Sequence, residues 1–439
     1  MILKWFKRKE NSSKKGQPIV APNSPSPRKN KSSKGNKKPV KNKAPAWKID
    51  QFVVEKIDGK TRFHDLNIHL NVLRAIQASG YEYCTPIQAK TLPSTLKGLD
   101  LIGKGQTGTG KTAAFLITII DQLLCHPLKE QAYLAEPRAL IIAPTRELVK
   151  QIEADARDLC QFTQLSIVSL VGGEKYDKQL NQLEKQSVDI VVATPGRLID
   201  FTQRKALFLD QVEILVLDEA DRMLDMGFIP QVKQIVRQTP PKEDRQTLLF
   251  SATFTQDIVN LSSRWTLSPI SIDVAPEKIA TETVEQISYL VSDHEKVATL
   301  AKLVQSEAVK RAIIFTNRKD QSQRLYDNLT RLGIKVGILT GDIQQNKRTQ
   351  TLSAFKTGKT RLLIATDVVG RGIHIDGITH VFNYNLPQEP ENYIHRIGRT
   401  GRAGASGKAI NLIGEEDVYD LPSLEKLLGY KLELLTLPT

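Results

Sequence analysis

The sequence predicts an α/β protein with two doubly wound parallel-sheet domains in tandem, preceded by a disordered basic tail. Short, fully apolar runs rich in β-branched residues recur along the chain, and helical stretches separate them, which is typical of parallel sheets covered on both faces. A third observation is that the excess positive charge is confined to the first 48 residues. The 439 residues suffice for about two to three compact units.

The first 48 residues differ in composition from the rest of the chain. They hold 15 of its 62 Lys and Arg residues and one of its 48 acidic residues, so residues 49–439 carry 47 of each sign. The segment is rich in Ser, Asn, Pro and Gly and poor in apolar residues, so we expect it to be disordered. Two interpretations stay open: an electrostatic tether for nucleic-acid phosphates, or a tail that only confers solubility.

The apolar runs and the cysteines argue against a membrane-spanning protein, a disulfide framework and a zinc module. The longest apolar runs are far shorter than the ~20 residues that a bilayer requires, so we expect no membrane span. Cys84, Cys125 and Cys160 are isolated and odd in number. This pattern argues against a disulfide framework or a zinc module and favours a reducing cytoplasm. We therefore expect a cytoplasmic protein.

Two series of strands define the expected domains. The first series comprises 100–102, 139–143, 166–170, 189–193, 214–217 and 247–250. The second comprises 286–291, 312–315, 335–339, 361–365, 380–383 and 409–412. Between them the chain is polar and lacks apolar periodicity. We expect a tail over 1–48, a first domain over 49–275 and a second over 276–439.

The sequence GQTGTGKT at 105–112 predicts a nucleoside triphosphate site. It directly follows the first expected strand and precedes a helical run. Gly105 and Gly110 let backbone N–H groups approach phosphates, Lys111 can reach the β and γ oxygens, and Thr112 offers a hydroxyl to Mg²⁺. The helix N-terminus adds partial positive charge. This motif alone leaves kinases, GTPases, transporter ATPases and helicases open.

The acidic sequence DEAD at 218–221 indicates which reaction this nucleotide site performs. It follows an apolar strand, and open α/β sheets bind their ligands at the carboxyl ends of strands. Asp218 is placed to hold Mg²⁺, as the second acidic component of such a site does. Glu219 could then orient and deprotonate the attacking water. Together the two motifs predict hydrolysis of ATP or GTP and not binding alone.

An ordered set of motifs resembles that of the DEAD-box RNA helicases over nearly all of residues 63–414. The set comprises Phe63, GYEYCTPIQ (80–88), GQTGTGKT (105–112), PTREL (144–148), GG (172–173), TPGR (194–197), DEAD (218–221), SAT (251–253), IIFTN (313–317), TGD (340–342), Gln345 with Arg348, ATDVVGRG (365–372) and HRIGRTGR (395–402). The resemblance implies two RecA-like domains, an RNA-dependent ATPase that converts ATP and water to ADP and phosphate, and ATP and Mg²⁺ as cofactors.

The resemblance also assigns the nucleotide site. The Gln88 amide offers a donor and an acceptor that match the N6/N7 edge of adenine, which selects ATP over GTP. The family places an aromatic residue at Tyr81 against the adenine ring, with Phe63 behind it. The full set is Phe63, Tyr81, Gln88, Gly105, Gln106, Thr107, Gly108, Thr109, Gly110, Lys111, Thr112, Gly372 and His374. His374 replaces an Asp that contacts the ribose in the family.

Two arginines of the second half complete the implied catalytic set. Arg399 and Arg402 lie three residues apart, so on a helical turn they face the same way. In the family they are arginine fingers that reach the γ-phosphate, which can raise the rate by ~10³–10⁵. Hydrolysis then requires closure of the two domains, which RNA binding would favour. The catalytic residues are Lys111, Asp218, Glu219, Arg399 and Arg402, and the coupling residues are Ser251, Thr253, His395 and Arg396.

RNA contacts are implied on both domains. Small residues, hydroxyls and arginines suit a groove that follows sugar and phosphate and does not read bases. The first domain contributes Pro144, Thr145, Arg146, Gly172, Gly173, Thr194, Gly196 and Arg197. The second contributes Thr316, Gly341, Gln345, Arg348 and Thr366. Single-stranded RNA and short RNA duplexes are the expected partners of a monomeric protein.

Several local sequences are similar to those of the bacterial degradosome helicase, which implies docking on ribonuclease E. They are CTPIQ (84–88), YDKQL (176–180), LTGD (339–342), RGIH (371–374) and RTGRAGASG (399–407). We expect an ATP-dependent RNA helicase that locally unwinds short duplexes in bacterial RNA turnover. Two alternatives stay open: an ATP-gated RNA clamp or annealing chaperone, and a DNA-directed translocase of the same superfamily.

Overall fold

The computed structural model describes residues 47–105, 108–128, 133–274, 284–306, 308–370, 375, 377–401 and 406–436. The expected tail lies outside these residues except for its last two. The expected boundary between 275 and 276 also lies outside them.

The first domain contains a seven-stranded parallel sheet with the strand order β3-β4-β2-β5-β6-β1-β7. Its strands are β1 (Leu101–Lys104), β2 (Ala139–Ile142), β3 (Ile167–Leu170), β4 (Ile190–Ala193), β5 (Ile214–Leu217), β6 (Gln246–Ser251) and β7 (Ile270–Asp273). All six strands expected here are present. The additional strand, β7, lies at the sheet edge and buries only one of its four residues fully.

The second domain repeats this arrangement. Its order, β10-β11-β9-β12-β13-β8-β14, is the first order with seven added to each number, and every pairing is again parallel. The strands are β8 (Val284–Leu290), β9 (Ala312–Thr316), β10 (Val336–Leu339), β11 (Leu362–Thr366), β12 (His380–Asn383), β13 (Gly407–Ile413) and β14 (Leu434–Leu435). The two halves therefore share one doubly wound topology, as predicted.

Helices connect successive strands in both domains. The first domain has α2 (Leu70–Ala78), α3 (Pro86–Thr95), α4 (Lys111–Cys125), α5 (Arg146–Leu159), α6 (Tyr176–Lys185), α7 (Pro195–Gln203), α8 (Ala220–Asp225), α9 (Ile229–Val236) and α10 (Gln256–Trp265). The second has α12 (Lys296–Val304), α13 (Lys319–Arg331), α14 (Gln345–Lys356), α15 (Asp367–Gly370), α16 (Pro390–Ile397) and α17 (Leu421–Leu428). Short 3₁₀ turns are η2 (Ile49–Gln51), η3 (Phe63–Asp65) and η4 (Asp417–Tyr419).

Alternate residues of the strands fill two cores, one on each face of the sheet. In β2, Ala139 and Ile141 pack into one cluster with α4 and α5, whereas Leu140 and Ile142 pack into the other with α7 and α9. Because both faces are covered, almost every strand residue is apolar. This is why the apolar runs of the sequence predicted the strands.

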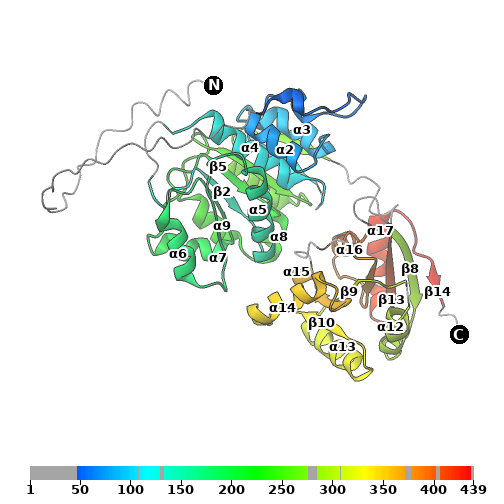
Figure 1. Cartoon of the computed structure of the whole chain (residues 1–439). Coiled ribbons are helices and arrows are strands. Elements are labelled where there is room, and N and C mark those ends of the chain that lie inside the picture. Colours follow the sequence, from blue (N-terminus) through cyan, green and yellow to red (C-terminus); the bar gives the residue numbers. More distant parts are fainter. Residues whose placement is uncertain are drawn as a thin grey trace, which may run out of the picture.

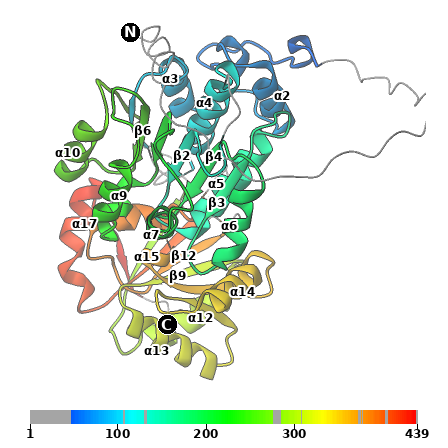
Figure 2. The ribbon, with the colours of Figure 1, turned by 90° about the vertical axis from the view of Figure 1, so that its left-hand side faces the viewer.

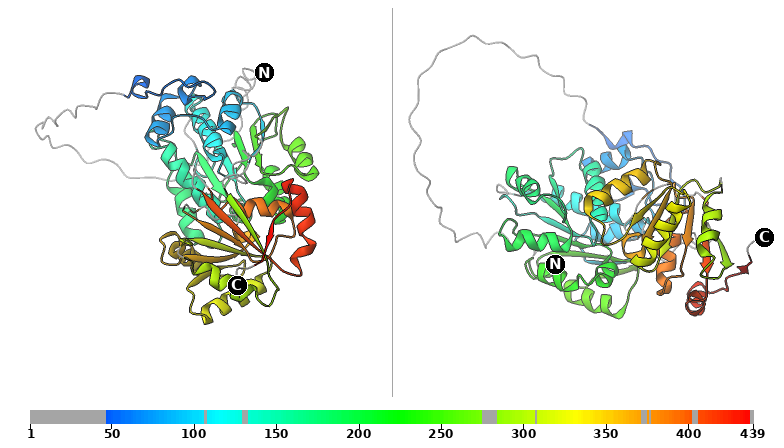
Figure 3. Two further views of the ribbon diagram at one scale, coloured as in Figure 1. Left: turned by 90° about the vertical axis from the view of Figure 1, so that its right-hand side faces the viewer. Right: turned by 90° about the horizontal axis from the view of Figure 1, so that it is seen from below.

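The two domains adjoin through the carboxyl edges of their sheets. The first domain, blue to green in Figure 1, and the second, yellow-green to red, have their own sheets. Figures 2 and 3 show the second domain lying against the first. All three cysteines are free. No helix in the described part of the chain has the length and apolarity that a membrane crossing needs.

Candidate active site and RNA interface

The phosphate-binding loop joins β1 to α4, and a glutamine of α3 holds it. Gly110 caps α4 with a left-handed φ of +93°, which residues with side chains rarely adopt. The Gln88 amide donates from Nε2 to the Gly110 carbonyl at 3.0 Å and accepts from the Thr85 N–H at 2.9 Å. A Cβ on Gly110 would lie 2.5 Å from that Nε2 atom, so glycine is required. In this structure the Gln88 amide therefore fixes the loop, and its adenine contact stays a prediction.

The lysine of the loop points back into the loop. Lys111 is buried at the start of α4, and its Nζ donates to the Gly105 carbonyl. Gly108, Gly110 and Thr112 line the adjacent cavity together with Lys111. The predicted site residues Gln106 and Thr107 lie outside the described residues.

A cavity of about 710 Å³ opens beside the loop, which is within the size range of small-ligand sites. Its lining includes Tyr81, Gln88, Lys111, Thr112, Asp218 and Glu219. Tyr81 is 45% exposed and can stack on a planar ligand. Phe63 does not line this cavity; it is 1% exposed and packs in the first-domain core. Its position is that of a core aromatic residue, and a supporting role for Tyr81 stays a prediction.

Asp218 enters this cavity at the carboxyl end of β5. It is buried, and its N–H donates to the Ile142 carbonyl at 3.0 Å. Burial raises the pKa of Asp218, the neighbouring Lys111 opposes this rise, and Glu219 adds to it. A divalent cation would favour the charged carboxylate, so Asp218 and the Thr112 hydroxyl form a donor set that fits Mg²⁺. No cluster of three metal-ligating side chains occurs in the described part of the chain.

Glu219 has an unusual backbone conformation. Its φ of +52° and ψ of +54° are left-handed, and its N–H donates to Asp218 Oδ1 at 3.0 Å. Its carboxylate Oε2 accepts from Arg222 Nη1 at 3.0 Å, and both side chains are at most 9% exposed. Non-glycine residues persist in such conformations only where their surroundings fix them, and they cluster at functional sites.

The last aspartate of DEAD holds the SAT sequence. Asp221 Oδ2 accepts from the N–H groups of Ala252 and Thr253, both at 3.0 Å, and from the Thr253 hydroxyl at 3.3 Å. The Ser251 hydroxyl donates to the Thr253 carbonyl at 2.7 Å. Neither Asp221 nor Arg222 was among the predicted site residues. The structure thus joins the predicted coupling residues Ser251 and Thr253 to the end of the acidic motif.

A second cavity, of about 390 Å³, is shared by the two domains. The lining from the first domain includes Lys111, Glu219, Arg222, Ala252 and Thr253, and that from the second includes Glu389, Asn392, His395 and Arg399. Arg399 is 2% exposed, and its Nε donates to the His395 carbonyl at 3.0 Å. The predicted arginine finger therefore lines the same cavity as the predicted general base. Its predicted partner, Arg402, lies outside the described residues, as do Gly372 and His374.

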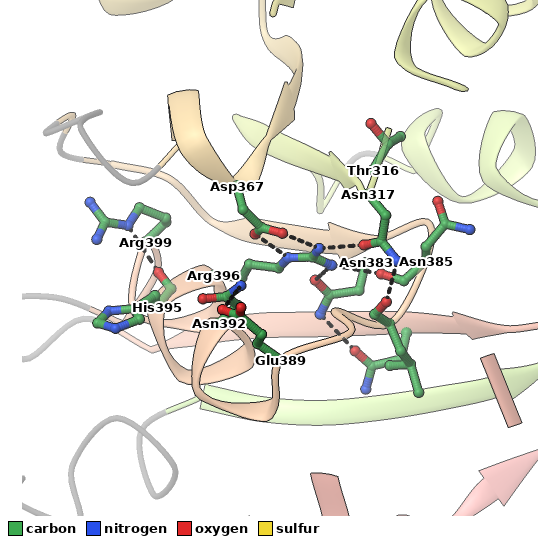
Figure 4. A network of polar contacts seen from close by, with 12 residues as sticks. Thr316, Asn317, Asp367, Asn383, Asn385, Glu389, Asn392, His395, Arg396 and Arg399 are labelled. Carbon is green, nitrogen blue, oxygen red and sulfur yellow. Dashed lines mark hydrogen bonds and ion pairs between the residues drawn. The ribbon is translucent and has the colours of Figure 1, made fainter. Parts of the chain in front are cut away.

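Arg396 lies at the centre of a network inside the second domain (Figure 4). Its guanidinium makes two hydrogen bonds to the Asp367 carboxylate, at 2.6 and 2.7 Å. It also donates to Asn317 Oδ1 at 2.7 Å and to the Asn385 carbonyl at 2.6 Å. Arg396 is 1% exposed, so any coupling that it provides acts from within this domain and not through contact with the first domain. The sequence did not mark Asp367 as its partner.

The predicted RNA residues of the first domain follow β2, β3 and β4 at one edge of the sheet. Thr145 caps α5 by accepting from the Leu148 N–H, and Thr194 precedes α7. The Arg146 guanidinium packs against Gly172 and Gly173, and a Cβ on Gly173 would collide with it. Arg197 donates to the Glu174 carbonyl at 3.2 Å. Pro144 and Gly196 complete this edge.

The predicted RNA residues of the second domain divide into two groups. Gln345 and Arg348 lie in the first turn of α14, and Gly341 lies in the loop before it. Thr316 and Thr366 end β9 and β11 and are buried, at 0% and 7% exposure. The Thr316 hydroxyl bonds Ser322 Oγ at 2.6 Å, so the structure leaves Thr316 no exposed surface for RNA.

Two hydrogen bonds across the domains involve the predicted RNA residues Arg146, Gln345 and Arg348. Arg146 Nη1 donates to Gln345 Oε1 at 2.6 Å, and Arg348 Nε donates to Glu147 Oε1 at 2.7 Å. Burial lowers the pKa of Arg146, and the nearby Arg348 and Arg197 guanidinium groups contribute to the shift. Three guanidinium groups therefore gather where a polyanion would be favoured.

Two family models match the chain: DEAD/DEAH box helicase over residues 85–261 and helicase conserved C-terminal domain over residues 295–404. The ATP-dependent RNA helicase RhlB of Pseudomonas syringae pv. tomato is 56% identical over 88% of this chain and 97% of its own length. RhlB of Escherichia coli O7:K1 is 44% identical over 84% of this chain and 88% of its own. The structure of S. cerevisiae Dbp5 bound to RNA and ADP BeF3 superposes with a TM-score of 0.75 at 30% identity, covering 86% of this chain and 96% of the chain in that structure. The chain belongs to the DEAD-box family of ATP-dependent RNA helicases, which are RNA-stimulated ATPases with two RecA-like domains.

Proposed function

We propose that this helicase locally unwinds short RNA duplexes by closing its two domains around ATP and single-stranded RNA. The observation that carries the proposal is the cavity shared by the domains, which is lined by Lys111 and Glu219 on one side and by Arg399 on the other. Because the site has residues from both domains, hydrolysis depends on closure. Dbp5, which superposes well on this chain, was solved with RNA and a nucleotide together.

The proposed chemistry is an in-line attack of water on the γ-phosphate. Glu219 orients the water and accepts its proton while the water oxygen bonds to phosphorus and the bond to the β-phosphate breaks. Lys111, Arg399 and Arg402 stabilise the charge that develops on the phosphate oxygens. Mg²⁺, held by Thr112 and Asp218 with water, would supply further positive charge to the β and γ oxygens.

We propose that nucleotide recognition combines stacking on Tyr81 with the free hydrogen-bonding capacity of the Gln88 amide. Each amide has two donor hydrogens and an oxygen with two lone pairs, so the bonds to Thr85 and Gly110 leave capacity for an adenine edge. Phe63 supports this region from the core. Gly372 and His374 would lie on the ribose side.

RNA would follow the edge where Arg146, Arg197 and Arg348 gather, with contacts to sugar and phosphate. Such a track distinguishes RNA from DNA through the 2′-hydroxyl. RNA that bridges the two domains stabilises the closed state, and by linkage the closed state binds RNA more tightly. Ser251, Thr253, His395 and Arg396 would transmit this coupling.

Duplex separation is the property that distinguishes the proposal from its alternatives. Phosphate release should be measured with no nucleic acid, with single-stranded RNA and with matched DNA, alongside strand separation of a duplex of about one helical turn. Stimulation and strand separation with RNA alone support the proposal. Stimulation without separation indicates an RNA clamp or annealing chaperone, and equal stimulation by DNA indicates a translocase.

The strong likeness to RhlB supports a place in bacterial RNA turnover. We propose that the chain acts as a monomer in the cytoplasm and docks on ribonuclease E within a degradosome. Purified ribonuclease E should co-elute with the full chain in size-exclusion chromatography and raise its RNA-stimulated turnover. Separate elution, with unchanged turnover, would argue against this assembly.

A further inference from the structure

Two buried Arg–Glu ion pairs bracket β5, one at each end. Glu213 directly precedes the strand and bonds Arg138, with Nη2 to Oε2 at 2.9 Å and Nε to Oε1 at 3.1 Å. Glu219 follows the strand by two residues, and its Oε2 bonds Arg222 Nη1 at 3.0 Å. The side chains of the first pair are 6% and 13% exposed, and those of the second are 5% and 9% exposed. Both pairs therefore join an arginine to a glutamate at similar depth, the first through two nitrogens of the guanidinium and the second through Arg222 Nη1.

The two pairs differ in their surroundings. Arg138 also donates to the carbonyls of Leu123 and His126, so this pair ties the end of α4 to the sheet. Neither Arg138 nor Glu213 lines either cavity of the active site. Arg222 and Glu219 both line the cavity that the two domains share, together with Arg399. Only the second pair therefore lies where water would attack the γ-phosphate.

The backbone conformation of Glu219 does not by itself fix the rotamer of its side chain. The left-handed backbone fixes where its side chain starts, but the rotatable bonds of the side chain still allow several rotamers. The Arg222 guanidinium selects one of them by bonding Oε2, and none of the hydrogen bonds among the described residues uses Oε1, which could accept from a water. Arg222 is itself 4% exposed and starts from the first turn of α8, so its own position is well defined.

We propose that Arg222 is a positioning residue for ATP hydrolysis, which holds the Glu219 carboxylate toward the cavity that contains Arg399. The inference rests on the proposed function, in which Glu219 accepts the proton of the attacking water. Arg222 takes no proton and makes no bond to phosphate; it acts through Glu219. A general base displaced by about 1 Å can cost up to 10² in rate.

The test compares the same conservative change at the two pairs, R222K and R138K, in the full chain. Lysine keeps the charge but lacks the planar fork of donors. We expect both variants to lower the melting temperature. We expect R222K alone to reduce RNA-stimulated kcat by about tenfold or more, with the KM for ATP and the Kd for RNA within about twofold of the wild type. R222Q keeps an N–H donor near Oε2, so we expect it to retain more activity than R222M. If R222K does not fold, R222Q and R222M are compared instead.

Equal kcat values for R222K and R138K, corrected for the folded fraction, would overturn the inference. A matching loss of RNA or ATP affinity in R222K would also overturn it, because the residue would then act in binding. E219Q, measured in parallel, separates this result from the proposed function. If E219Q still hydrolyses ATP, Glu219 is not the base. If E219Q is inactive while R222K matches R138K, only the role of Arg222 fails.

Discussion

Arg348 and Glu147 connect the two domains through an ion pair with 2.7 Å between Nε and Oε1. Their side chains are 14% and 19% exposed, so the pair is shielded from most of the solvent. Arg146, which precedes Glu147 in the chain, bonds Gln345 one helical turn before Arg348. Three of these four residues are also predicted RNA contacts. We therefore predict that domain closure and RNA binding use the same side chains, so that each affects the other.

We predict that Glu147→Gln weakens domain closure. A hydrogen bond to a charged group contributes roughly 1.5–3 kcal/mol, so RNA-stimulated kcat should fall by about tenfold while ATP affinity stays unchanged. Fluorescence energy transfer between labels on the two domains, with RNA and a non-hydrolysable ATP analogue, would measure closure. Asp320→Asn is the control, because the Arg318–Asp320 pair is exposed and lies within one domain. If the Glu147→Gln variant closes its domains as fully as the Asp320→Asn variant does, the prediction is wrong.

We predict that Arg396→Met destabilises the second domain selectively. The change removes a buried guanidinium and leaves the Asp367 carboxylate and the Asn317 side chain without this partner. Breaking a buried ion pair costs about 3–5 kcal/mol. Hydrogen exchange in the full chain should therefore accelerate in β9, β11 and α16, with β2 and β5 unaffected. Arg331→Met, on α13, is the control. Equal acceleration in both domains would show that Arg396 supports the interface and not only its own domain.

The sequence predicted the strands well because both faces of each sheet are covered. A run such as Ile190–Ala193 is fully buried and stands out as a continuous apolar segment. The strands that were missed, β7 and β14, lie at sheet edges, where β7 is largely uncovered and β14 has two exposed residues. Edge position alone is not the reason, because the edge strand β3 is fully buried and was predicted; β7 and β14 differ from it in leaving most of their residues exposed or partly exposed.

The sequence predicted those residues of the candidate site that belong to a motif whose residue types and spacing indicate a chemical role. Lys111 and Asp218 follow strands whose carboxyl ends meet at one edge, which the topology guarantees. The pairing of Arg222 with Glu219, three residues apart, was not predictable because it depends on side-chain rotamers. The pairing of Arg396 with Asp367 was not predictable because it joins two elements that lie far apart in the sequence. Asp155 of α5 lines the nucleotide cavity, yet in the sequence it resembles any polar residue on an amphipathic helix.

We predict that titration of Asp218 makes the thermal stability of the protein and its affinity for Mg²⁺ depend on pH. Burial raises the pKa of Asp218 to about 7 from its ordinary value of 3.8. The folded protein without nucleotide therefore holds a proton there that the unfolded chain releases, so this stabilisation is present below about pH 4 and is lost as the pH rises through about 7. With EDTA, Asp218→Asn should melt at a higher temperature than the wild type at pH 8, and the difference should shrink toward pH 5.

The same carboxylate must be ionised to hold Mg²⁺. We therefore predict that the affinity of the wild type for Mg²⁺ with a fluorescent ATP analogue falls as the pH decreases below about 7. Asp177→Asn, on the exposed face of α6, is the control and should behave as the wild type in both experiments. A melting difference between Asp218→Asn and the wild type that is the same at pH 5 and pH 8 would show that Asp218 does not titrate in this range.

We predict that the basic tail contributes phosphate contacts. Deletion of residues 1–46 removes 14 Lys and Arg residues and spares Trp47, whose indole N–H donates to Gln77 Oε1 at 2.9 Å. The logarithm of RNA affinity falls with the logarithm of salt concentration by ~0.7 per neutralised phosphate of a single strand. The deletion should flatten this slope, and a tail of equal length with every Lys and Arg replaced by Gln should flatten it equally. An unchanged slope in both variants would leave the tail a role in solubility alone, whereas a change in the deletion only would show that the length of the tail matters and its charge does not.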